Sequence, residues 1–413
     1  MRILMISDVY FPRVNGVSTS TATFITELKA LGHHVTLITP EYSSKKVINI
    51  DIEAGIIRVP SRKVLFDPED RFMIQKHVHK ILPQLREKNF DLIHIQTPFV
   101  AHYLGMWLSR ELELPSLVTY HTFFEEYLFH YLPVVPKKWM RYFARYFTLK
   151  QCNQTEHIVV PSSAMRKVLS DYGVTTPMTI LPTGIPLREF GTGNREQFRK
   201  QYGINEDRPV ITTIGRVAFE KNLDFLLDVV VRIKEQIPNI LFLIAGEGPM
   251  LNHLKKRVSK ENLEDNVLFV GYLDREVGLQ ACYKATDVFI FASRTETQGL
   301  VLLEAMAEGI PVVSTAEMGT KDVLREGQGC LISNEDTDEF SDKVVTLFND
   351  IELRNTLSTT GKKYVKKWTA SFFANKLSEL YQELVQFSTL NYELESSSYS
   401  ETFIPRIDTQ ERS

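Results

Sequence analysis

The stretch "RPVITTIGRVAFEKN" (Arg208–Asn222) marks the point where the chain repeats an earlier pattern. It holds a short apolar run rich in β-branched residues, then a glycine, then a charged loop that leads into a helical pattern. A comparable run, "RILMIS" (2–7), lies near the start of the chain, and both are followed by further strand-like runs separated by helical segments. Such alternation is typical of a parallel sheet covered by helices, so the restart predicts two doubly wound α/β domains.

The proline- and glycine-rich stretch "LPTGIPLREF" (181–190) is the expected boundary between the two domains. We predict a first domain over residues 1–187 and a second over 188–367. A last helix is expected over 368–387, in "WTASFFANKLSELYQELVQF". Residues 388–413 are rich in serine and polar residues, which predicts a mobile tail.

The composition of the chain is that of an ordinary globular protein. Its 413 residues include 43% hydrophobic residues, and its formal net charge is -3, which gives no global signal for nucleic acid. The three cysteines have neither metal-ligand nor disulfide spacing, and "MRILMISDVYFP" is too short in its apolar run for a signal peptide. No apolar run reaches the length of a membrane span, so we expect a cytosolic protein.

Several chemically useful residues fall at predicted strand ends, where open parallel sheets bind ligands. Asn15 and Gly16 stand just ahead of a helix, where free backbone N–H groups could meet an anion; a plain turn explains them equally well. Arg216 and Lys221 could hold a diphosphate, although two such charges more often form a solvated surface. Gly246 belongs to a short Gly-x-Gly, which alone is weak evidence.

Two acids, Glu296 and Glu304, lie near the two ends of the run "TETQGLVLLE" (295–304). Gly299 should lie at a helix N-terminus, with Glu296 in the loop before it and Glu304 inside the helix. A carboxylate is costly in an apolar setting unless something pairs with it, so either a ligand or a nearby cation is expected for Glu304. His121 follows a strand of the first domain, where a lone histidine is more often structural than catalytic.

The stretch "PKKWMRYFARYFTLKQ" (136–151) interleaves basic and aromatic residues at helical spacing. Such a helix could rest on an anionic membrane surface. It could equally pack its aromatic side chains into the first domain, and the sequence leaves both readings open.

Taken in this order, the motifs resemble the retaining glycosyltransferases of the GT-B fold, over residues 1 to about 387. The most specific parts are Gly215-Arg216 with "EKN" (220–222), "AGEGP", and the paired glutamates followed by "EAMAEGIPVVS". "TYHTFFEEYLFHYLP" and "TETQGL" resemble the diacylglycerol glucosyltransferases and, more distantly, the phosphatidylinositol mannosyltransferases. The resemblance implies two Rossmann-like domains facing a central cleft, with the C-terminal helix returning to the first domain.

The resemblance also implies roles for individual residues. Arg216 and Lys221 would hold the diphosphate, Glu304 would accept hydrogen bonds from the ribose, and Glu296 and His121 would contact the transferred sugar. The implied catalytic residues are His121, Arg216, Lys221 and Glu296. The implied donor-binding residues are Asn15, Gly16, Gly215, Gly246, Tyr272, Leu273, Thr297, Gln298, Gly299, Leu300 and Glu304. The implied acceptor or membrane side is formed by Tyr10, Lys137, Lys138, Trp139, Arg141 and Arg145.

The implied activity is transfer of a hexose from a nucleotide sugar to a membrane lipid such as diacylglycerol, or to a cell-envelope glycan. UDP-glucose is the expected donor, although users of GDP-mannose share most of the motifs. The chain lacks an Asp-x-Asp pattern for a metal-bound diphosphate, so no metal or other cofactor is expected. We expect the protein in the cytoplasm, either free or peripheral on the inner face of the cell membrane. Alternatives are a GT-B epimerase or hydrolase and a non-catalytic sugar-nucleotide-binding protein.

Three features depart from the pattern of that family. Asn15 stands where many relatives carry a glycine, and Glu308 precedes "GIPVVS" where a small or neutral residue is common. The stretch "RKVLFDPEDRF" (62–72) differs from the proline-aromatic segment usual in the lipid glucosyltransferases.

Overall fold

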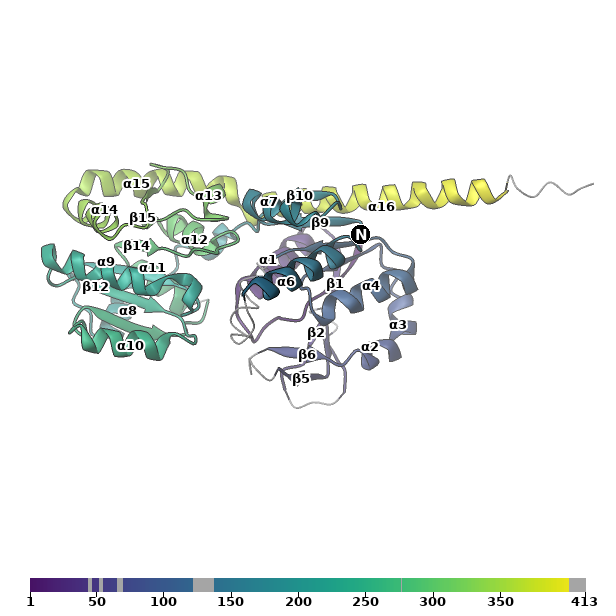
Figure 1. The fold of residues 1–413 in the computed structure, drawn as a ribbon, viewed down its shortest axis with the longest axis horizontal. Coiled ribbons are helices and arrows are strands. Elements are labelled where there is room, and N and C mark those ends of the chain that lie inside the picture. Colours follow the sequence, from purple (N-terminus) through teal and green to yellow (C-terminus); the bar gives the residue numbers. More distant parts are fainter. Residues whose placement is uncertain (44–46, 52–54, 65–69, 122–136, 276, 401–413) are drawn as a thin grey trace, which may run out of the picture.

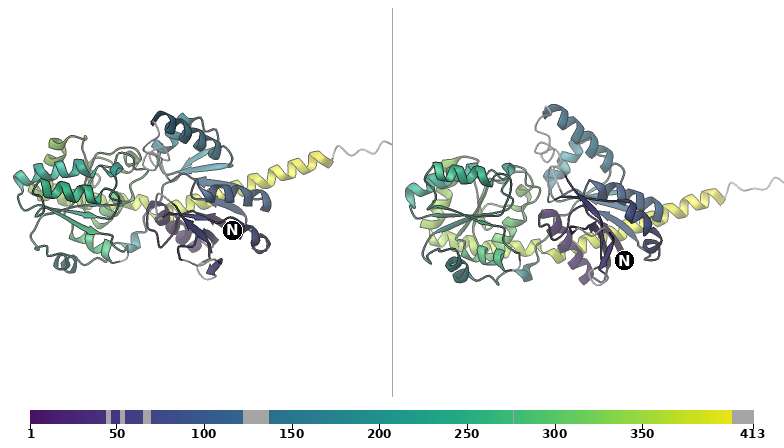
Figure 2. Two further views of the ribbon diagram at one scale, coloured as in Figure 1. Left: turned by 60° about the horizontal axis from the view of Figure 1, so that its bottom comes forward. Right: turned by 90° about the horizontal axis from the view of Figure 1, so that it is seen from below.

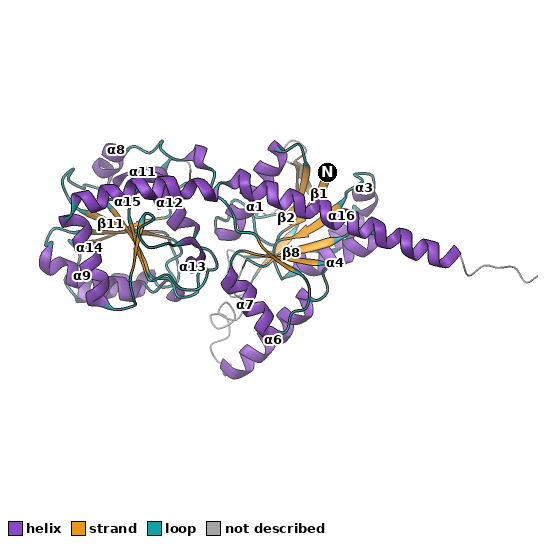
Figure 3. Ribbon diagram, turned by 90° about the horizontal axis from the view of Figure 1, so that it is seen from above, coloured by secondary structure: helices purple, strands orange, loops and turns teal. Residues whose placement is uncertain are grey.

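The computed structural model describes residues 1–43, 47–51, 55–64, 70–121, 137–275 and 277–400, without the side chains of 137 and 391–400. The chain forms two α/β lobes joined side by side, and a long C-terminal helix runs along the first lobe and past it (Figure 1). Each lobe holds a sheet between layers of helices (Figure 3). The two predicted doubly wound sheets are therefore confirmed.

The first sheet has the strand order β10-β9-β8-β7-β1-β2-β4-β3, and its register is parallel except where β3 meets β4. Its strands are β1 (Arg2–Ile6), β2 (His34–Pro40), β3 (Asn49–Asp51), β4 (Ile56–Val59), β7 (Leu92–Ile95), β8 (Ser116–Thr119), β9 (His157–Val160) and β10 (Met178–Ile180). A separate hairpin is formed by β5 (Ser61–Lys63) and β6 (Arg71–Met73). The order reverses between β1 and β7, which makes the carboxyl ends of these two strands the expected ligand side.

The second sheet is wholly parallel, with the order β13-β12-β11-β14-β15-β16. Its strands are β11 (Val210–Ile214), β12 (Leu241–Ala245), β13 (Val267–Gly271), β14 (Val288–Phe291), β15 (Val312–Ser314) and β16 (Cys330–Ile332). Every residue of β11, β12 and β14 is buried, because helices cover both faces of the sheet. Here the order reverses between β11 and β14.

The helices of the first domain are α1 (Gly16–Ala30), α2 (Lys76–Lys80), α3 (Leu82–Arg86), α4 (Val100–Leu112), α6 (Lys137–Cys152) and α7 (Ser163–Tyr172). Those of the second are η1 (Leu187–Glu189), α8 (Arg195–Gln201), η2 (Phe219–Lys221), α9 (Leu223–Gln236), α10 (Leu251–Lys260), α11 (Gly278–Ala285), α12 (Leu300–Glu308), α13 (Thr320–Val323), α14 (Thr337–Asn349), α15 (Ile351–Tyr364) and η3 (Val365–Trp368). Their ends follow local chemistry. Ser162 caps α7 by accepting a hydrogen bond from the Met165 amide, and the helix stops at Gly173 in the left-handed region.

The chain passes between the two domains at one place. Ile185, in the connector after β10, pairs with Thr369, which precedes the last helix, α16 (Ala370–Ser400). The Ile185 amide donates to Trp368 O at 2.8 Å, and the Ala370 amide donates to Ile185 O at 2.9 Å. Two segments far apart in sequence therefore cross between the domains together. Figure 2 shows the yellow C-terminal helix running on along the first lobe and past it.

Helix α16 returns to the first domain, as predicted. Leu377 and Tyr381 are fully buried against β1, β2 and α1, in a cluster that also holds Phe373, Ala374 and Leu380. The Tyr381 hydroxyl lies 2.6 Å from His94 Nδ1, on β7.

The predicted end of this helix at residue 387 is wrong. It continues to Ser400, so residues 388–400 belong to a helix, and residues 401–413 lie outside the described part of the chain. Phe387 and Leu390 are 64% and 58% exposed, so neither side chain is buried against the first domain. No described helix is both long and apolar enough to cross a membrane.

Candidate active site

Two residues that the sequence singled out meet where the order of the second sheet reverses. Lys221 ends the turn η2 after β11, and Glu296 lies in the loop after β14. Lys221 Nζ is 2.6 Å from Glu296 Oε2, and the two side chains are 22% and 19% exposed. Arg216, on the same loop as Lys221, is exposed. A cationic loop and an acid thus face one another at the expected ligand side of the sheet.

The loops after β11 and β12 are held against each other by backbone hydrogen bonds. The Val217 amide donates to Glu247 O at 2.8 Å, and the Met250 amide donates to Val217 O at 3.0 Å. Gly246 has φ +136°, and a Cβ there would lie 1.9 Å from Gly215 O. The predicted donor-binding Gly246 therefore has a structural reason within the protein, because it allows these loops to touch. A Cβ on Gly215 would meet nothing within 4 Å, but its φ of +152° favours glycine there.

The helix that carries Glu304 begins at Gly299. This residue has φ +91° and is the N-cap of α12, and no described side chain caps that helix. The N-cap residue therefore supplies no side-chain acceptor to the first N–H groups of α12, such as that of Leu300. A helix N-terminus of this kind favours negative charge.

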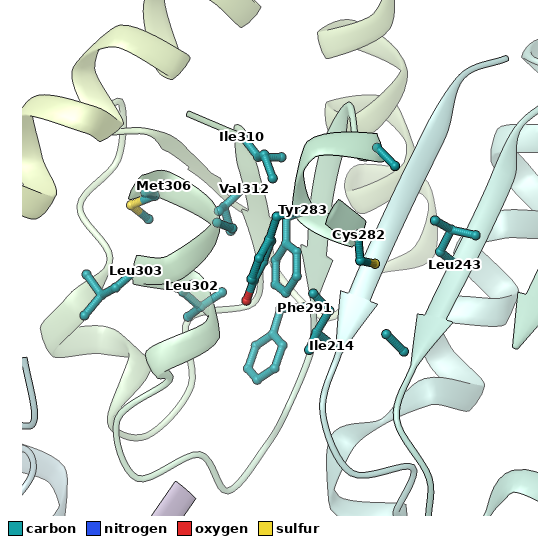
Figure 4. Packing of buried hydrophobic residues seen from close by; sticks show 14 of the residues in the cluster. Ile214, Leu243, Cys282, Tyr283, Phe291, Leu302, Leu303, Met306, Ile310 and Val312 are labelled. Atoms are coloured by element: carbon teal, nitrogen blue, oxygen red, sulfur yellow. The ribbon is translucent and has the colours of Figure 1, made fainter. Parts of the chain in front are cut away.

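Glu304 lies deeper, and its side chain is only 3% exposed. Its Oε1 accepts a hydrogen bond from Arg275 Nη2 at 2.8 Å, and its Oε2 accepts one from the Tyr283 hydroxyl at 2.8 Å. Burial and then the Glu304 charge raise the pKa of Tyr283 well above its ordinary value. Burial opposes the charge of Arg275, but Glu304 raises the pKa of that guanidinium. The ring of Tyr283 lies among the apolar side chains of the core, close to Leu302 (Figure 4).

The first domain contributes a set of buried polar groups at its own reversal point. Asp8 follows β1 and accepts hydrogen bonds from Thr97 Oγ1 at 2.8 Å and from the Ala101 amide at 3.0 Å, at the start of α4. Burial raises the pKa of Asp8 to about 7. His121 follows β8, and its Nε2 lies 2.9 Å from Gln96 Oε1, which follows β7.

His121 faces the second domain. Thr297 Oγ1 donates to the His121 carbonyl oxygen at 3.1 Å, which brings this histidine next to the loop that holds Glu296. Burial lowers the pKa of His121 to about 4, so the ring is neutral at pH 7. Because Gln96 Oε1 can only accept, Nε2 of His121 carries the hydrogen and Nδ1 keeps a lone pair.

The other predicted first-domain residues fall near the start of α1. The side chain of Asn15 is occupied: its Oδ1 accepts from the Ser18 amide at 2.9 Å, and the Ser18 hydroxyl accepts from the Asn15 amide, forming a capping box. A Cβ on Gly16 would meet nothing within 4 Å, so the protein itself leaves space there. Tyr10 is 8% exposed and packs against Phe11, which leaves little of its ring for an acceptor.

At the far end of the site, Tyr272 and Leu273 follow β13. Tyr272 is 54% exposed, whereas Leu273 packs partly against the core of the second domain. The Gly246 amide donates to Gly271 O at 2.8 Å, so this segment continues the row of loops after β11 and β12.

Two side chains near the site hold the domains together. Gln298 uses both ends of its amide on Thr183 in the connector, accepting from the Thr183 amide at 2.8 Å and donating to its carbonyl oxygen at 2.5 Å. Asp322, in α13, accepts from the amide and the hydroxyl of Ser163, at 2.5 and 2.6 Å, at the start of α7. The Gln298 side chain is therefore committed to the connector, and only its backbone is left for a ligand.

Glu308, the unusual acid before "GIPVVS", also acts on the connector. Its Oε1 accepts from the Gly191 amide at 2.6 Å, and its Oε2 forms an ion pair with Lys284 Nζ at 2.6 Å. Its side chain is 1% exposed. This acid therefore joins α12, α11 and the segment that enters the second domain.

Helix α6 does not pack most of its aromatic side chains into the first domain. Its buried face is formed by Met140, Ala144, Thr148, Gln151 and Cys152. The opposite face carries Trp139, Tyr142, Phe143 and Tyr146, which are 56–70% exposed.

The basic residues of α6 differ in their surroundings. Lys138, Arg141 and Lys150 are exposed. Arg145 donates to the Asp171 and Tyr172 carbonyl oxygens at 3.0 and 3.3 Å, at the end of α7. The side chain of Lys137 lies outside the described residues.

Sequence reasoning missed Arg275, Tyr283, Asp8 and Gln96. Arg275 lies two residues after Leu273, and only the depth of Glu304 hinted that a buried acid would need such a cation. Asp8 and Gln96 follow β1 and β7, and the strand-end rule could have found them. Tyr283 carried no sequence signal, because a tyrosine in an apolar helix is usually core.

Matches to known proteins cover both domains. Residues 14–189 match the family model "Glycosyltransferase Family 4", and residues 194–364 match "Glycosyl transferases group 1". An alpha-monoglucosyldiacylglycerol synthase of Streptococcus pneumoniae is 35% identical over 323 residues, which cover 76% of this chain and 71% of that protein. The enzyme of the same name from Acholeplasma laidlawii is 28% identical over 398 residues, covering 93% of this chain and 98% of the other.

Solved structures share the arrangement of the two domains. A sucrose-phosphate synthase from Thermosynechococcus elongatus has a TM-score of 0.73 at 22% identity and covers 93% of this chain and 98% of its own. Anabaena HepE in complex with UDP-glucose also has a TM-score of 0.73, at 15% identity, and covers 93% of this chain and 100% of its own. Together with the two lobes, the returning helix and the Lys221–Glu296 pair, these matches show that the chain belongs to the group 1 (family 4) glycosyltransferases of the GT-B fold.

Proposed function

We propose that this protein is a retaining hexosyltransferase that moves glucose from UDP-glucose to a diacylglycerol-type lipid at a membrane surface. The lipid acceptor is supported by the two relatives named as alpha-monoglucosyldiacylglycerol synthases. The nucleotide is supported by the fold relative that binds UDP-glucose. Mannosyltransferases named as GDP-mannose-dependent are also similar to this chain, at 25% identity over 395 residues in one case, so the donor needs a direct test.

One observation carries the proposal. The Lys221–Glu296 pair at the reversal point of the second sheet lies next to Thr297, which is hydrogen-bonded to His121 of the first domain. Groups from both domains therefore converge on one place. A donor bound there would meet a cationic loop, an acid and a neutral imidazole within a single site.

The charges fit the transfer of a sugar from a diphosphate. Breaking the bond between the anomeric carbon and the phosphate oxygen builds negative charge on the leaving nucleotide, which Arg216 and Lys221 would stabilise. Lys221 has three donor hydrogens, so it can contact a phosphate while it keeps Glu296 in place. Glu296 would then accept from hydroxyls of the sugar, and Glu304 from hydroxyls of the ribose.

His121 suits a contact with the uncharged sugar. A cationic ring there would compete for the leaving phosphate, but burial lowers the pKa of His121 to about 4. The neutral ring can accept a hydrogen bond from a sugar hydroxyl through Nδ1. Gly16, whose surroundings leave room for a ligand, would let the first domain close on the donor.

Helix α6 would rest on the membrane that supplies the acceptor. Its exposed face of four aromatic side chains is bordered by Lys138, Arg141 and Lys150, a composition that suits the headgroup region of an anionic bilayer. The helix begins sixteen residues after His121 in the chain.

Catalysis would not need a metal ion, because Arg216 and Lys221 can neutralise the diphosphate. Transfer should therefore continue in excess EDTA. Loss of transfer in EDTA, with recovery on addition of magnesium or manganese, would contradict this part of the proposal.

The decisive experiment offers the purified protein radiolabelled UDP-glucose, UDP-galactose or GDP-mannose with vesicles that contain diacylglycerol. We expect label in the lipid phase with UDP-glucose, and an α-linkage by NMR, as retention requires. Release of free sugar, an epimerised donor or a bound but unreacted donor would favour the epimerase, hydrolase or binding-protein alternatives.

Membrane attachment has its own test. Sedimentation with vesicles containing phosphatidylglycerol should carry down the wild-type protein, and vesicles of phosphatidylcholine alone should carry down much less. A variant with Trp139→Ser and Phe143→Ser should stay in solution in both cases. The double change Tyr103→Ser and Phe72→Ser, also at exposed first-domain aromatics, is the matched control.

A further inference from the structure

Arg275 is hydrogen-bonded to Glu304, the acid that we assign to the ribose. Its Nη2 donates to Glu304 Oε1 at 2.8 Å, while the Tyr283 hydroxyl donates to the other carboxylate oxygen. The Arg275 side chain is 25% exposed, whereas Tyr283 is fully buried. Arg275 therefore covers Glu304 from the solvent side, and Tyr283 supports it from below.

This cover has a clear physical reason when no ligand is bound. The Glu304 side chain is 3% exposed, and a carboxylate so far from water is strongly destabilising without a partner. The Arg275 guanidinium supplies the opposite charge and a charge-assisted hydrogen bond. An incoming ribose would offer hydroxyl donors to the same oxygen from the same side.

Arg275 also has a second acid within reach. Its Nε lies 3.9 Å from Glu189 Oε2, and the Glu189 side chain is 47% exposed. Glu189 belongs to η1, in the connector between the domains. Glu189 therefore offers Arg275 an alternative acidic partner to Glu304.

The connector links this exchange to the first domain. Arg188, next to Glu189, forms an ion pair with Glu27 of α1 at 2.9 Å, and the Glu27 side chain is 8% exposed. A contact from Arg275 to Glu189 would therefore strengthen the hold of the second domain on a segment already fixed to the first.

We propose that Arg275 is a gate on the nucleotide site: it covers Glu304 in the empty enzyme and is displaced to Glu189 by the ribose of the bound nucleotide. This inference rests on the proposed function, because it takes Glu304 as the ribose acceptor. It adds that Arg275 competes with the ribose for Glu304. It also adds that binding of the nucleotide changes a contact to the connector, at Glu189. Arg275 acts through these two acids and is a positioning residue.

The first test is nucleotide binding to the full chain by calorimetry, with UDP and with GDP as probes. When a site is covered for most of the time, its apparent Kd is the intrinsic Kd divided by the fraction of molecules in which the site is open. Arg275→Ala should therefore bind UDP about tenfold more tightly than the wild type. Arg275→Gln, which keeps a donor but loses the charge, should shift affinity in the same direction by a smaller factor.

The second test separates the gate from a merely structural role. Glu189→Gln leaves the Glu304 pair intact but removes the alternative partner, so it should weaken UDP binding about threefold. The same change in the Arg275→Ala background should have no effect. Arg232→Ala, which removes an ion pair with Asp338, is the matched control and should change neither value.

Thermal melts give an independent readout. The gate predicts that Arg275→Ala lowers the Tm of the empty protein more than that of the UDP-saturated protein, because the Glu304 pair exists only without ligand. Weaker or unchanged UDP binding in Arg275→Ala, or an equal loss of Tm in both states, would overturn the gate while leaving the glycosyltransferase assignment intact. Failure of the wild-type protein to bind either nucleotide would overturn the proposed function and the gate together.

Discussion

The two domains prepare their sides of the site in different ways. In the second domain the site residues are charged and already paired, as Lys221 with Glu296 and Arg275 with Glu304. In the first domain they are buried and close to neutral: burial raises the pKa of Asp8 to about 7 and lowers that of His121 to about 4. Under the proposed function, the second domain would balance the charge of the donor, whereas the first would supply shape, hydrogen bonds and protection from water.

The largest expected effect tests whether the first domain can exist without the end of the chain. A protein that ends at Lys367 lacks Leu377, Leu380 and Tyr381, which cover the first sheet. Each buried side chain of this kind is worth about 1.5–3 kcal/mol, so the loss is comparable to the whole stability of a domain. We expect an insoluble and inactive product, measured by soluble yield and transfer assay.

A protein that ends at Phe387 is the matched control. It keeps the buried residues of α16 and loses only the projecting part, so it should be soluble and fold normally. Soluble, active protein from the shorter chain would show that α16 does not brace the first domain.

The next largest expected effect tests the two cations of the second domain, Arg216 and Lys221. Arg216→Ala and Lys221→Ala should each reduce kcat by roughly two or more powers of ten, because each removes a cation that would stabilise the leaving diphosphate. Both residues lie on a loop, so the Tm should fall little. Steady-state kinetics and melts check this pair of expectations. Near-normal turnover in either variant would mean that the diphosphate is held elsewhere.

The two acids should separate in kinetics. Glu304→Gln should chiefly raise the KM for the donor, since the ribose is bound before and during the reaction alike. Glu296→Gln should chiefly lower kcat, because its expected partner is the migrating sugar. We expect losses of about ten- to a hundredfold in each case. An identical pattern in both variants would refute this division of labour.

The fold, and the charged residues proposed for the site, could be predicted from the sequence because both depend on local pattern. Buried runs with helices between them predict parallel sheets, and the ends of such strands point to Arg216, Lys221, Glu296 and Glu304. What lies close in space but far in sequence could not be predicted. Nothing near residue 275 in the chain announces a contact with Glu304.

The ends of helices and their buried faces were also difficult to predict from the sequence. The serine-rich composition after Phe387 predicted a tail, yet helical hydrogen bonds continue to Ser400. Phe372 and Phe373 are adjacent aromatic residues that the composition does not distinguish, yet Phe372 is 48% exposed and Phe373 packs inward. On α6, alternating basic and aromatic residues suit either of two orientations, and only the position of Met140 and Ala144 against the core decides between them.

The smallest expected effect concerns Asp8, one of the buried polar residues of the first domain. The folded protein raises the pKa of Asp8 from 3.8 to about 7, so the folded state holds a proton that the unfolded state loses. This contribution to stability is fully present below pH 4 and is lost as the pH rises toward 7. Asp8→Asn cannot ionise, so its Tm relative to the wild type should rise between pH 4 and pH 7 and level off above that range. A constant difference over that range would show that Asp8 is ionised in the folded protein.

The return of α16 also sets an order of events during synthesis. The first strand made, β1, is covered on one face by side chains near residue 377, which leave the ribosome only after the whole second domain. At about 5–20 residues per second, the face of the first sheet stays uncovered for tens of seconds. The second domain needs no such late partner for its own sheet. The domain that is synthesised first should therefore reach its final structure last, and chaperones should meet it in its uncovered form.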